Sequence, residues 1–263
     1  MLKKILKYDL ENIFKLLIIF YSLSLFFALL TRILLDIENS FIMNILGQIS
    51  SGVTISMIFN ILINNLMRLW VRFKNNFYGD ESYLTHTLPI SKNTLYLSKF
   101  LTSIITLFTS IFIIGLTLFI AYYSKENIQF LKDLLLPVAN IYDTSIMKII
   151  VAFLFIFFLE FANLLQSGYT GIILGYRKNN NKLGYSVLFG FITYILTQIF
   201  VLIIMFFMGI FNKDIMNLFF TNQIINIDIL KTIIYIAILI YTITLLVCYF
   251  INLKLFNKGV NVD

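Results

Sequence analysis

Apolar and polar residues alternate along the chain in long blocks. A membrane-spanning helix needs about 20 predominantly apolar residues. Six blocks meet this requirement: residues 16–35, 41–67, 96–123, 146–174, 184–210 and 230–253. Inside hydrocarbon every backbone amide and carbonyl must find a partner within its own segment, so we predict helices rather than open strands. The pattern therefore predicts an all-α integral membrane fold with six transmembrane helices, forming a single domain over residues 1–263.

The residues before the first span form an amphipathic pattern. Over residues 1–15, leucines, isoleucines and a phenylalanine are set against four lysines, Glu11 and Asn12. This arrangement is typical of a helix that lies in the membrane interface with its lysines toward anionic head groups. We predict an N-terminal interfacial (elbow) helix here. The alternative is that these residues are the start of the first span.

Two further segments are predicted to carry helices outside the spans. Within residues 209–229, the stretch FNKDIMNLFFTNQIINID is neither long enough to cross the membrane nor polar enough to be a plain loop, which predicts short re-entrant or interfacial helices on the outer face. Within residues 124–145 we predict a short surface helix from Ile128 to Leu136. Pro137 should end it, because the residue before a proline avoids the helical region.

The composition supports a membrane location. Apolar residues make up 60% of the chain and charged residues 13%, with a mean hydropathy of +0.91. A soluble domain has about 45–50% apolar and about 25% charged residues. The lone Cys248 lies in an apolar run and excludes a disulfide scaffold or a cysteine-based metal cluster.

The net charge of +7 is interpreted as a signal of membrane topology rather than of nucleic-acid binding. Lysine and arginine collect on cytoplasmic loops. If the N-terminus is inside, fourteen of the 20 basic residues lie on the cytoplasmic side and six on the outer side. The sequence therefore predicts a multi-pass protein of the cell membrane with both termini in the cytoplasm.

Several kinds of chemistry are excluded by missing motifs. The sequence has no Gly-x-x-x-x-Gly-Lys-Ser/Thr loop to hold phosphates, so we expect no ATP hydrolysis in this chain. His86 is its single histidine, and there is no His-Glu-x-x-His pattern, so a zinc peptidase is not expected. No paired catalytic groups lie within the spans. We expect no catalytic residue, cofactor or metal in this chain.

Polar residues recur within two of the predicted spans. In the second span, polar or small residues occupy every fourth position: Asn44, Gln48, Gly52, Ser56, Asn60 and Asn64. Such a stripe should face another helix, a second subunit or a hydrated path. The fifth span has a milder version of this character: Tyr185, Thr193, Tyr194, Thr197 and Gln198. We predict that these two helices line a translocation pathway.

Glu160 is the one acidic residue deep in a span. It shares a helix face with Asn163, Ser167 and Thr170, which follow at steps of three or four residues. This face either contacts substrate and couples helix movements, or it joins helices through side-chain hydrogen bonds, and the pattern favours the second role. Nearby, Gly171-x-x-x-Gly175 allows a second helix to approach closely.

The segment between the second and third spans is the most polar passage of the first half. Gly79 and Asp80 are suited to begin a helix, and Asp80 and Glu81 would lie at its positive end. Pro89 should end this helix, and Ser91 should cap the third span. We predict a rigid two-turn helix that presents Tyr83 and His86 to the cytoplasm and docks on a partner. The alternative is a short loop helix lying on the membrane.

These features together resemble the permease of a type 2 ABC transporter, over nearly the whole chain. The most specific part runs from Tyr78 to Lys92 (YGDESYLTHTLPISK), which is similar to a Gly-Asp/Glu-Glu-x-Tyr-Leu…Thr-Leu-Pro-x-Ser stretch in small Gram-positive permeases. The resemblance implies that segment 68–95 holds a coupling helix seated in a groove of a separate ATPase subunit. The residues it implies for coupling are Gly79, Asp80, Glu81, Tyr83, Leu84, His86, Thr87 and Leu88.

The resemblance also implies partners and cargo. The partners are two ATPase subunits that bind ATP and Mg²⁺, a second permease copy (the same chain or a close paralogue) and the bilayer. The cargo would be amphipathic, antimicrobial or cytolytic peptides. Lipid-like or small-molecule drugs are an alternative cargo, and a non-transporting immunity or anchoring protein is an alternative function. From the polar patterns of the spans themselves, the residues predicted for the pathway or for helix packing are Gln48, Ser56, Asn60, Asn64, Glu160, Asn163, Ser167, Thr197 and Gln198.

Overall fold

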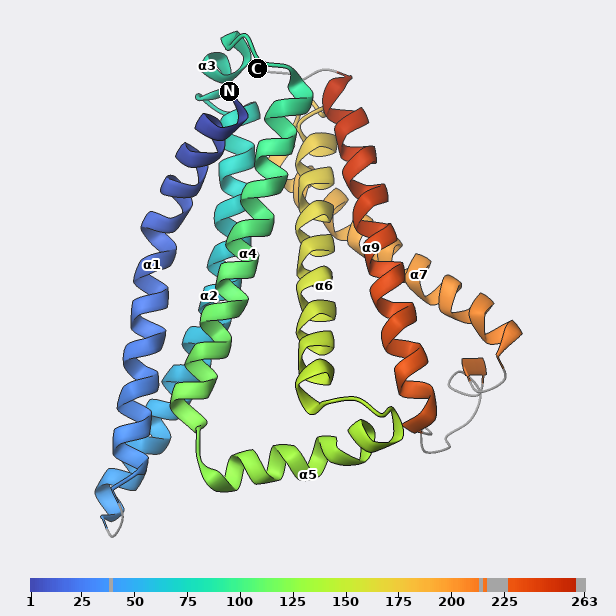
Figure 1. The fold of residues 1–263 in the computed structure, drawn as a ribbon. Helices are drawn as coiled ribbons and strands as arrows, with labels where there is room; N and C mark the ends of the chain where they lie inside the picture. The colour runs from blue at the N-terminus through green and yellow to red at the C-terminus, as the bar shows by residue number, and fades with distance from the viewer. Residues whose placement is uncertain (38–39, 213–214, 217–226, 259–263) are drawn as a thin grey trace. The chain divides into compact units, whose positions relative to one another are not determined.

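The fold is known from a computed structural model that describes residues 1–37, 40–212, 215–216 and 227–258. Every regular element in these ranges is a helix (Figure 1). The helices are α1 (Leu2–Leu35), α2 (Phe41–Tyr78), α3 (Ser82–Thr87), α4 (Lys92–Tyr122), α5 (Lys125–Ile141), α6 (Ile146–Gly175), α7 (Lys182–Phe211) and α9 (Ile227–Asn257).

Six helices of the described chain are long and apolar enough to cross a membrane: α1, α2, α4, α6, α7 and α9. Each contains a predicted span, so the chain is an all-helical, multi-pass membrane protein. The helices extend beyond the predicted spans because loss of apolar character does not itself end a helix. Thus α2 continues through residues 68–78, and most of the predicted 68–95 connecting segment is helical.

Two segments were predicted to carry helices outside the spans: residues 124–145 and 209–229. The surface helix predicted over Ile128–Leu136 is longer, because α5 runs from Lys125 to Ile141 with Pro137 inside it. A proline removes one helical hydrogen bond, but Pro137 is exposed and solvent is available to the freed carbonyl. The prediction that Pro137 ends the helix is therefore wrong. The predicted re-entrant segment 209–229 lies mostly outside the described residues.

The N-terminal segment is helical and continues without a break into the first span. Residues 2–15 belong to the 34-residue helix α1. Its buried face repeats every three to four residues, with Asp9, Ile13, Leu17 and Tyr21 among its members. The placement of residues 2–15 in the membrane interface stays a prediction.

The chain divides into two compact units. The first comprises Met1–Phe73 and Pro89–Leu131, and the second comprises Lys74–Leu88 and Lys132–Asp263. In the first unit α1 packs along α4. Hydroxyl side chains bond across this interface: Tyr21 Oη lies 2.7 Å from Ser110 Oγ, and Ser24 Oγ lies 3.2 Å from Thr117 Oγ1. Among them, serine and threonine are small. Such side chains allow close helix approach and bond across it.

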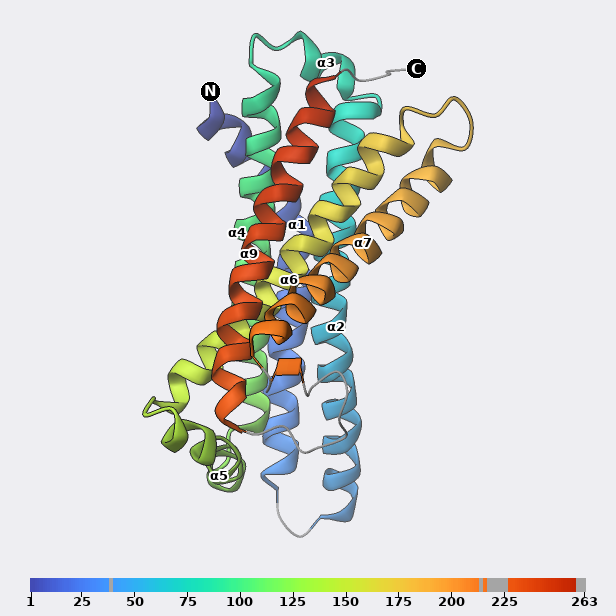
Figure 2. The ribbon, with the colours of Figure 1, turned by 90° about the vertical axis from the view of Figure 1, so that its right-hand side faces the viewer.

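In the second unit α6 packs against both α7 and α9 (Figure 2). The contact with α7 is very close at Gly171 and Gly175. A Cβ on Gly171 would lie 2.5 Å from Gly190 N, and one on Gly175 would lie 2.5 Å from Ser186 Cα. Glycine is needed at both positions because backbone of α7 occupies the space that a side chain would fill.

Candidate functional site

The connection between α2 and α4 is a short helix, α3, with non-helical residues on both sides of it. Helix α2 ends at Tyr78, and α3 begins at Ser82 rather than at Gly79 or Asp80 as predicted. Glu81 stands at its N-cap without a side-chain capping bond. Leu88 is extended (ψ 137°) before Pro89, so the helix stops where the sequence predicts. The predicted cap on α4 is confirmed, since Thr94 N–H donates to Ser91 Oγ at 3.3 Å.

One face of α3 is exposed and carries large apolar groups. Tyr83 and Leu84 are 66% and 75% exposed, and Leu88 is 47% exposed. Thr87, Asp80 and Glu81 are also exposed. This face of α3 therefore combines exposed apolar side chains with exposed polar and charged ones.

The opposite face of α3 points into its own unit. Ser82 is fully buried, and His86, one turn later, lies against Phe77. The His86 Nε2 lies 3.3 Å from the Phe77 carbonyl oxygen. The prediction that His86 faces outward with Tyr83 is therefore wrong. The reason is helical spacing, because His86 follows Ser82 by four residues and so shares its buried side.

Aromatic contacts hold the C-terminal end of α2, which leads into α3, within the second unit. The rings of Phe77 and Phe256 have centroids 4.6 Å apart, and those of Tyr78 and Tyr176 are 4.9 Å apart. Phe77 and Phe256 are fully buried. The C-terminal end of α2, immediately before α3, is thus joined to the C-terminal ends of α6 and α9. Sequence reasoning missed this aromatic cluster, because its members are far apart in the chain.

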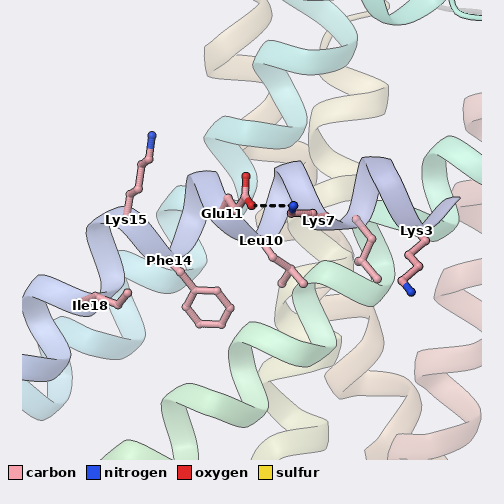
Figure 3. Close-up of a pocket in the computed structure, with 8 residues that line it drawn as sticks. Lys3, Lys7, Leu10, Glu11, Phe14, Lys15 and Ile18 are labelled. Atoms are coloured by element: carbon pink, nitrogen blue, oxygen red, sulfur yellow. Dashed lines mark ion pairs between the residues drawn. The ribbon is translucent and has the colours of Figure 1, made fainter. Parts of the chain in front are cut away.

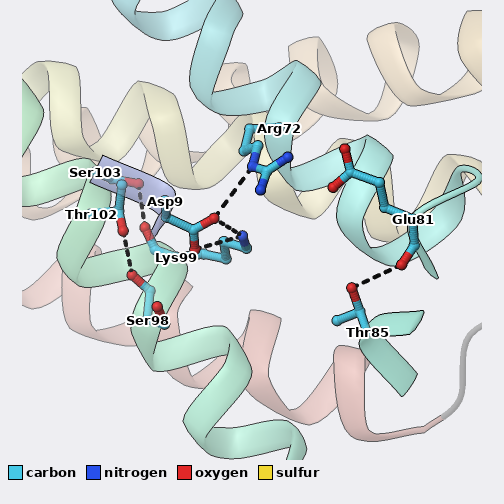
Figure 4. A network of polar contacts seen from close by, with 8 residues as sticks. All are labelled: Asp9, Arg72, Glu81, Thr85, Ser98, Lys99, Thr102 and Ser103. Carbon is cyan, nitrogen blue, oxygen red and sulfur yellow. Dashed lines mark hydrogen bonds and ion pairs between the residues drawn. The ribbon is translucent and has the colours of Figure 1, made fainter. Parts of the chain in front are cut away.

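A buried ion cluster in the first unit is the second feature that sequence reasoning missed (Figure 4). Asp9 on α1 and Lys99 on α4 are 2% and 4% exposed in their side chains. The Lys99 Nζ donates to both Asp9 carboxylate oxygens at 2.7 Å. Arg72 Nε on α2 donates to Asp9 Oδ1 at 3.3 Å. Asp9, Ile13 and Leu17 follow one another at steps of four residues and so share one face of the helix. This spacing indicates from the sequence that Asp9 lies on the same face as the apolar Ile13 and Leu17.

The polar stripe on α2 satisfies much of its bonding within its own helix. Ser56 Oγ donates to Gly52 O, Asn60 Nδ2 to Ser56 O, and Asn64 Nδ2 to Asn60 O. Gln48 bonds to Asn44. Asn44, Gln48 and Ser56 are exposed, and Asn60 and Asn64 are half-buried. The stripe is therefore presented outward rather than used to pack the unit that contains it.

Glu160 is placed between three helices of the second unit. Its Oε1 accepts from Tyr194 Oη at 2.7 Å and from Gln198 Nε2 at 2.9 Å, both on α7. Tyr241 on α9 interacts with the same carboxylate. Gln198 is thus brought to Glu160, as their polar character suggests, whereas Thr197 bonds back to Tyr194 O on its own helix.

The remaining polar residues of this face of α6 bond mainly to α9 or to their own helix. Asn163 Nδ2 donates to Tyr241 O at 3.0 Å. Thr170 Oγ1 lies 2.7 Å from Asn252 Oδ1. Ser167 Oγ donates to Asn163 O within α6. The contacts of Asn163 and Thr170 therefore join α6 to α9.

We expect Glu160→Gln to lower the stability of the protein. A neutral amide accepts more weakly from Tyr194 and Gln198, and hydrogen bonds to charged groups contribute about 1.5–3 kcal/mol. Thermal unfolding in detergent measures the loss, with Thr193→Val on α7 as the control, because Thr193 bonds to its own helix at Phe189 O. An altered substrate profile in a stable Glu160→Gln protein would contradict a packing role.

Comparison with known proteins adds no relative: no protein-family model matches the chain, and neither a curated protein nor a solved structure matches it.

Proposed function

We propose that the chain is the transmembrane subunit of an ATP-driven exporter of the type 2 ABC class. The observation that carries this proposal is α3, a short helix with an exposed Tyr83–Leu84 face and a buried base. Large exposed side chains on a rigid support are the usual anchors of protein interfaces. A separate ATPase subunit would bind Tyr83, Leu84 and Thr87, and would supply the ATP and Mg²⁺ chemistry for which this sequence has no motif.

The way α3 is built supports a mechanical role. It belongs to the second unit, yet it connects α2 and α4, which lie mostly in the first. The ring contacts of Phe77 and Tyr78 fix the end of α2 from which α3 follows, and Phe77 also contacts His86 of α3. On the other side of α3, the extended Leu88 and then Pro89 lead to α4. A displacement of α3 by an ATPase would therefore be passed along the chain to helices of both units. This is what coupling of ATP hydrolysis to helix movement requires.

The outward stripe on α2 supports assembly with a second copy of the permease. Asparagine, glutamine and serine side chains in a spanning helix are poorly placed against lipid. We propose that Gln48, Ser56, Asn60 and Asn64 face a second permease or a hydrated path between two copies. The cargo would be an amphipathic peptide, with lipid-like molecules as the alternative. The protein would lie in the cell membrane with both termini in the cytoplasm.

The decisive experiment removes the exposed face of α3. We expect Tyr83→Ala and Leu84→Asp to lower the ATPase stimulation of the co-purified complex at least tenfold. Because both side chains are exposed, neither change should lower the melting temperature of the permease. The measurements are ATP turnover with and without the permease, and thermal unfolding of the permease alone.

A matched control uses another exposed apolar pair. Phe130→Ala and Leu131→Asp alter α5, where the two side chains are 70% and 47% exposed. They should leave ATPase stimulation unchanged. Normal stimulation with both α3 variants would overturn the coupling role, and a chain that purifies from its native membrane without an ATPase would favour an anchoring or immunity function.

A further inference from the structure

The N-terminal part of α1 extends beyond the thickness that a membrane span needs. At about 1.5 Å per residue, its 34 residues measure about 51 Å. The hydrocarbon core is about 30 Å thick. The exposed Arg32–Asp36 ion pair marks the far end of the helix. Counting back one span from there puts the boundary of the core near Lys15, which would place the residues before it at the level of lipid head groups.

A shallow groove of about 630 Å³ runs along this part of α1 (Figure 3). Two adjacent rows of side chains line it, each with a four-residue repeat. One row is apolar and the other is charged; the rows are Leu6, Leu10, Phe14 and Ile18, and Lys3, Lys7, Glu11 and Lys15. Figure 3 shows Leu10 and Phe14 on one side of the helix, with Lys15 and Glu11 on the other.

The charges around this groove are only partly balanced by acidic residues of the same segment. Glu11 lies 3.7 Å from Lys7, but both side chains are more than half exposed, so this pair contributes little. Asp9 is the other acid of the segment, and it is buried against Lys99 and Arg72. The lysine row therefore keeps a net positive charge next to an apolar row, both at head-group depth.

We propose that this groove binds one anionic diacyl phospholipid. Lys3 and Lys7 lie on successive turns and would hold the phosphate, while an acyl chain would lie along Leu10, Phe14 and Ile18 toward the core of the membrane. Lys15 would extend its ammonium back toward the head groups over its own apolar stem.

The fit follows from charge and depth, because the positive end of the groove is at the head groups and its apolar end continues into the span. Asp9 orients the segment, since its contact with Lys99 turns the neighbouring rows outward.

The test compares lipid binding by purified protein, with no ATPase present, so it is independent of the proposed transport role. Phosphatidylglycerol and phosphatidylcholine are titrated separately, and bound lipid is counted by native mass spectrometry. We expect the protein to bind phosphatidylglycerol more tightly than phosphatidylcholine. Each lysine near a lipid surface contributes about a fivefold change in affinity. Lys3→Gln with Lys7→Gln should therefore weaken phosphatidylglycerol binding about ten- to thirtyfold.

Three further measurements separate the sources of binding. Lys125→Gln with Lys132→Gln removes the same charge from exposed positions on α5 and should leave phosphatidylglycerol binding unchanged. Phe14→Ala should weaken the binding of both lipids, since it removes a large apolar side chain from the apolar row. Soluble glycerol phosphate should not compete at millimolar concentration. Equal loss with the α5 lysines, equal binding of the two lipids, or displacement by glycerol phosphate would each overturn the proposal.

Discussion

Replacing Asp9 by alanine should destabilise the protein by about 3–5 kcal/mol, the range measured when one partner of a buried ion pair is removed. The Lys99 side chain is 4% exposed, and its ammonium donates to both Asp9 carboxylate oxygens at 2.7 Å. Without the carboxylate, a buried positive charge would remain beside the Arg72 guanidinium. The lysine must then lose its proton or move to water, and either change loosens α1 from α4. Thermal and denaturant-induced unfolding in detergent measure the effect.

Glu11→Ala is the matched control for Asp9. Glu11 lies on the same helix and pairs with Lys7, but their side chains are 53% and 72% exposed. Exposed pairs of this kind contribute about 0.3–0.5 kcal/mol. A second test replaces the pair by apolar groups, since Asp9→Leu with Lys99→Met should recover much of the stability that Asp9→Ala loses. Equal melting temperatures for Asp9→Ala and Glu11→Ala would show that the ion cluster does not hold α1.

Gly171→Ala and Gly175→Ala should each destabilise the second unit, by about 1–3 kcal/mol as is usual for overpacking, and by more when combined. At both positions the added methyl would meet backbone atoms of α7 at Ser186 or Gly190. Backbone cannot rotate away as a flexible side chain can, so α6 and α7 must separate. Separation also disturbs the bonds from Tyr194 and Gln198 to Glu160, which cross the same interface.

The control for these variants is Gly115→Ala on α4, where no atom lies within 4 Å of an added Cβ. Alanine is more favourable than glycine in a helix by up to about 1 kcal/mol. Gly115→Ala should therefore be neutral or slightly stabilising, opposite in sign to the changes on α6. Melting temperature and yield of folded protein in detergent distinguish the two results. If all three variants behave alike, the α6–α7 contact is looser than the structure describes.

Two members of the Asp9 cluster lie close to the α3 segment along the chain, one on each side of it. Lys99 lies two turns into α4, beyond the Pro89 link, and Arg72 lies in α2 before Phe77. The helices on either side of the α3 segment therefore hold the same carboxylate of α1. A variant that breaks this cluster should lower stability in the absence of any ATPase. The Tyr83 and Leu84 variants should instead change ATPase stimulation and leave stability unchanged.

The local features could be predicted from the sequence because each depends on neighbouring residues. Apolar block length determines the six candidate spans, and Pro89 and Ser91 determine where α3 stops and how α4 begins. The outward position of Tyr83, Leu84 and Thr87 follows from helical spacing. Where local rules conflict, prediction failed: α2 continues past its apolar run, and α5 tolerates Pro137 because the proline is exposed.

The tertiary structure alone decided which distant residues meet. Asp9 and Lys99 are 90 positions apart, and no periodicity within α1 names the lysine that faces it. The same holds for Phe77 with Phe256 and for Glu160 with Tyr194 and Gln198. Periodicity states which face of a helix is buried, whereas packing selects the helix that covers it. The sequence by itself therefore determined an all-helical membrane chain with an exposed α3 face, and the packing of its helices decided what that helix is anchored to.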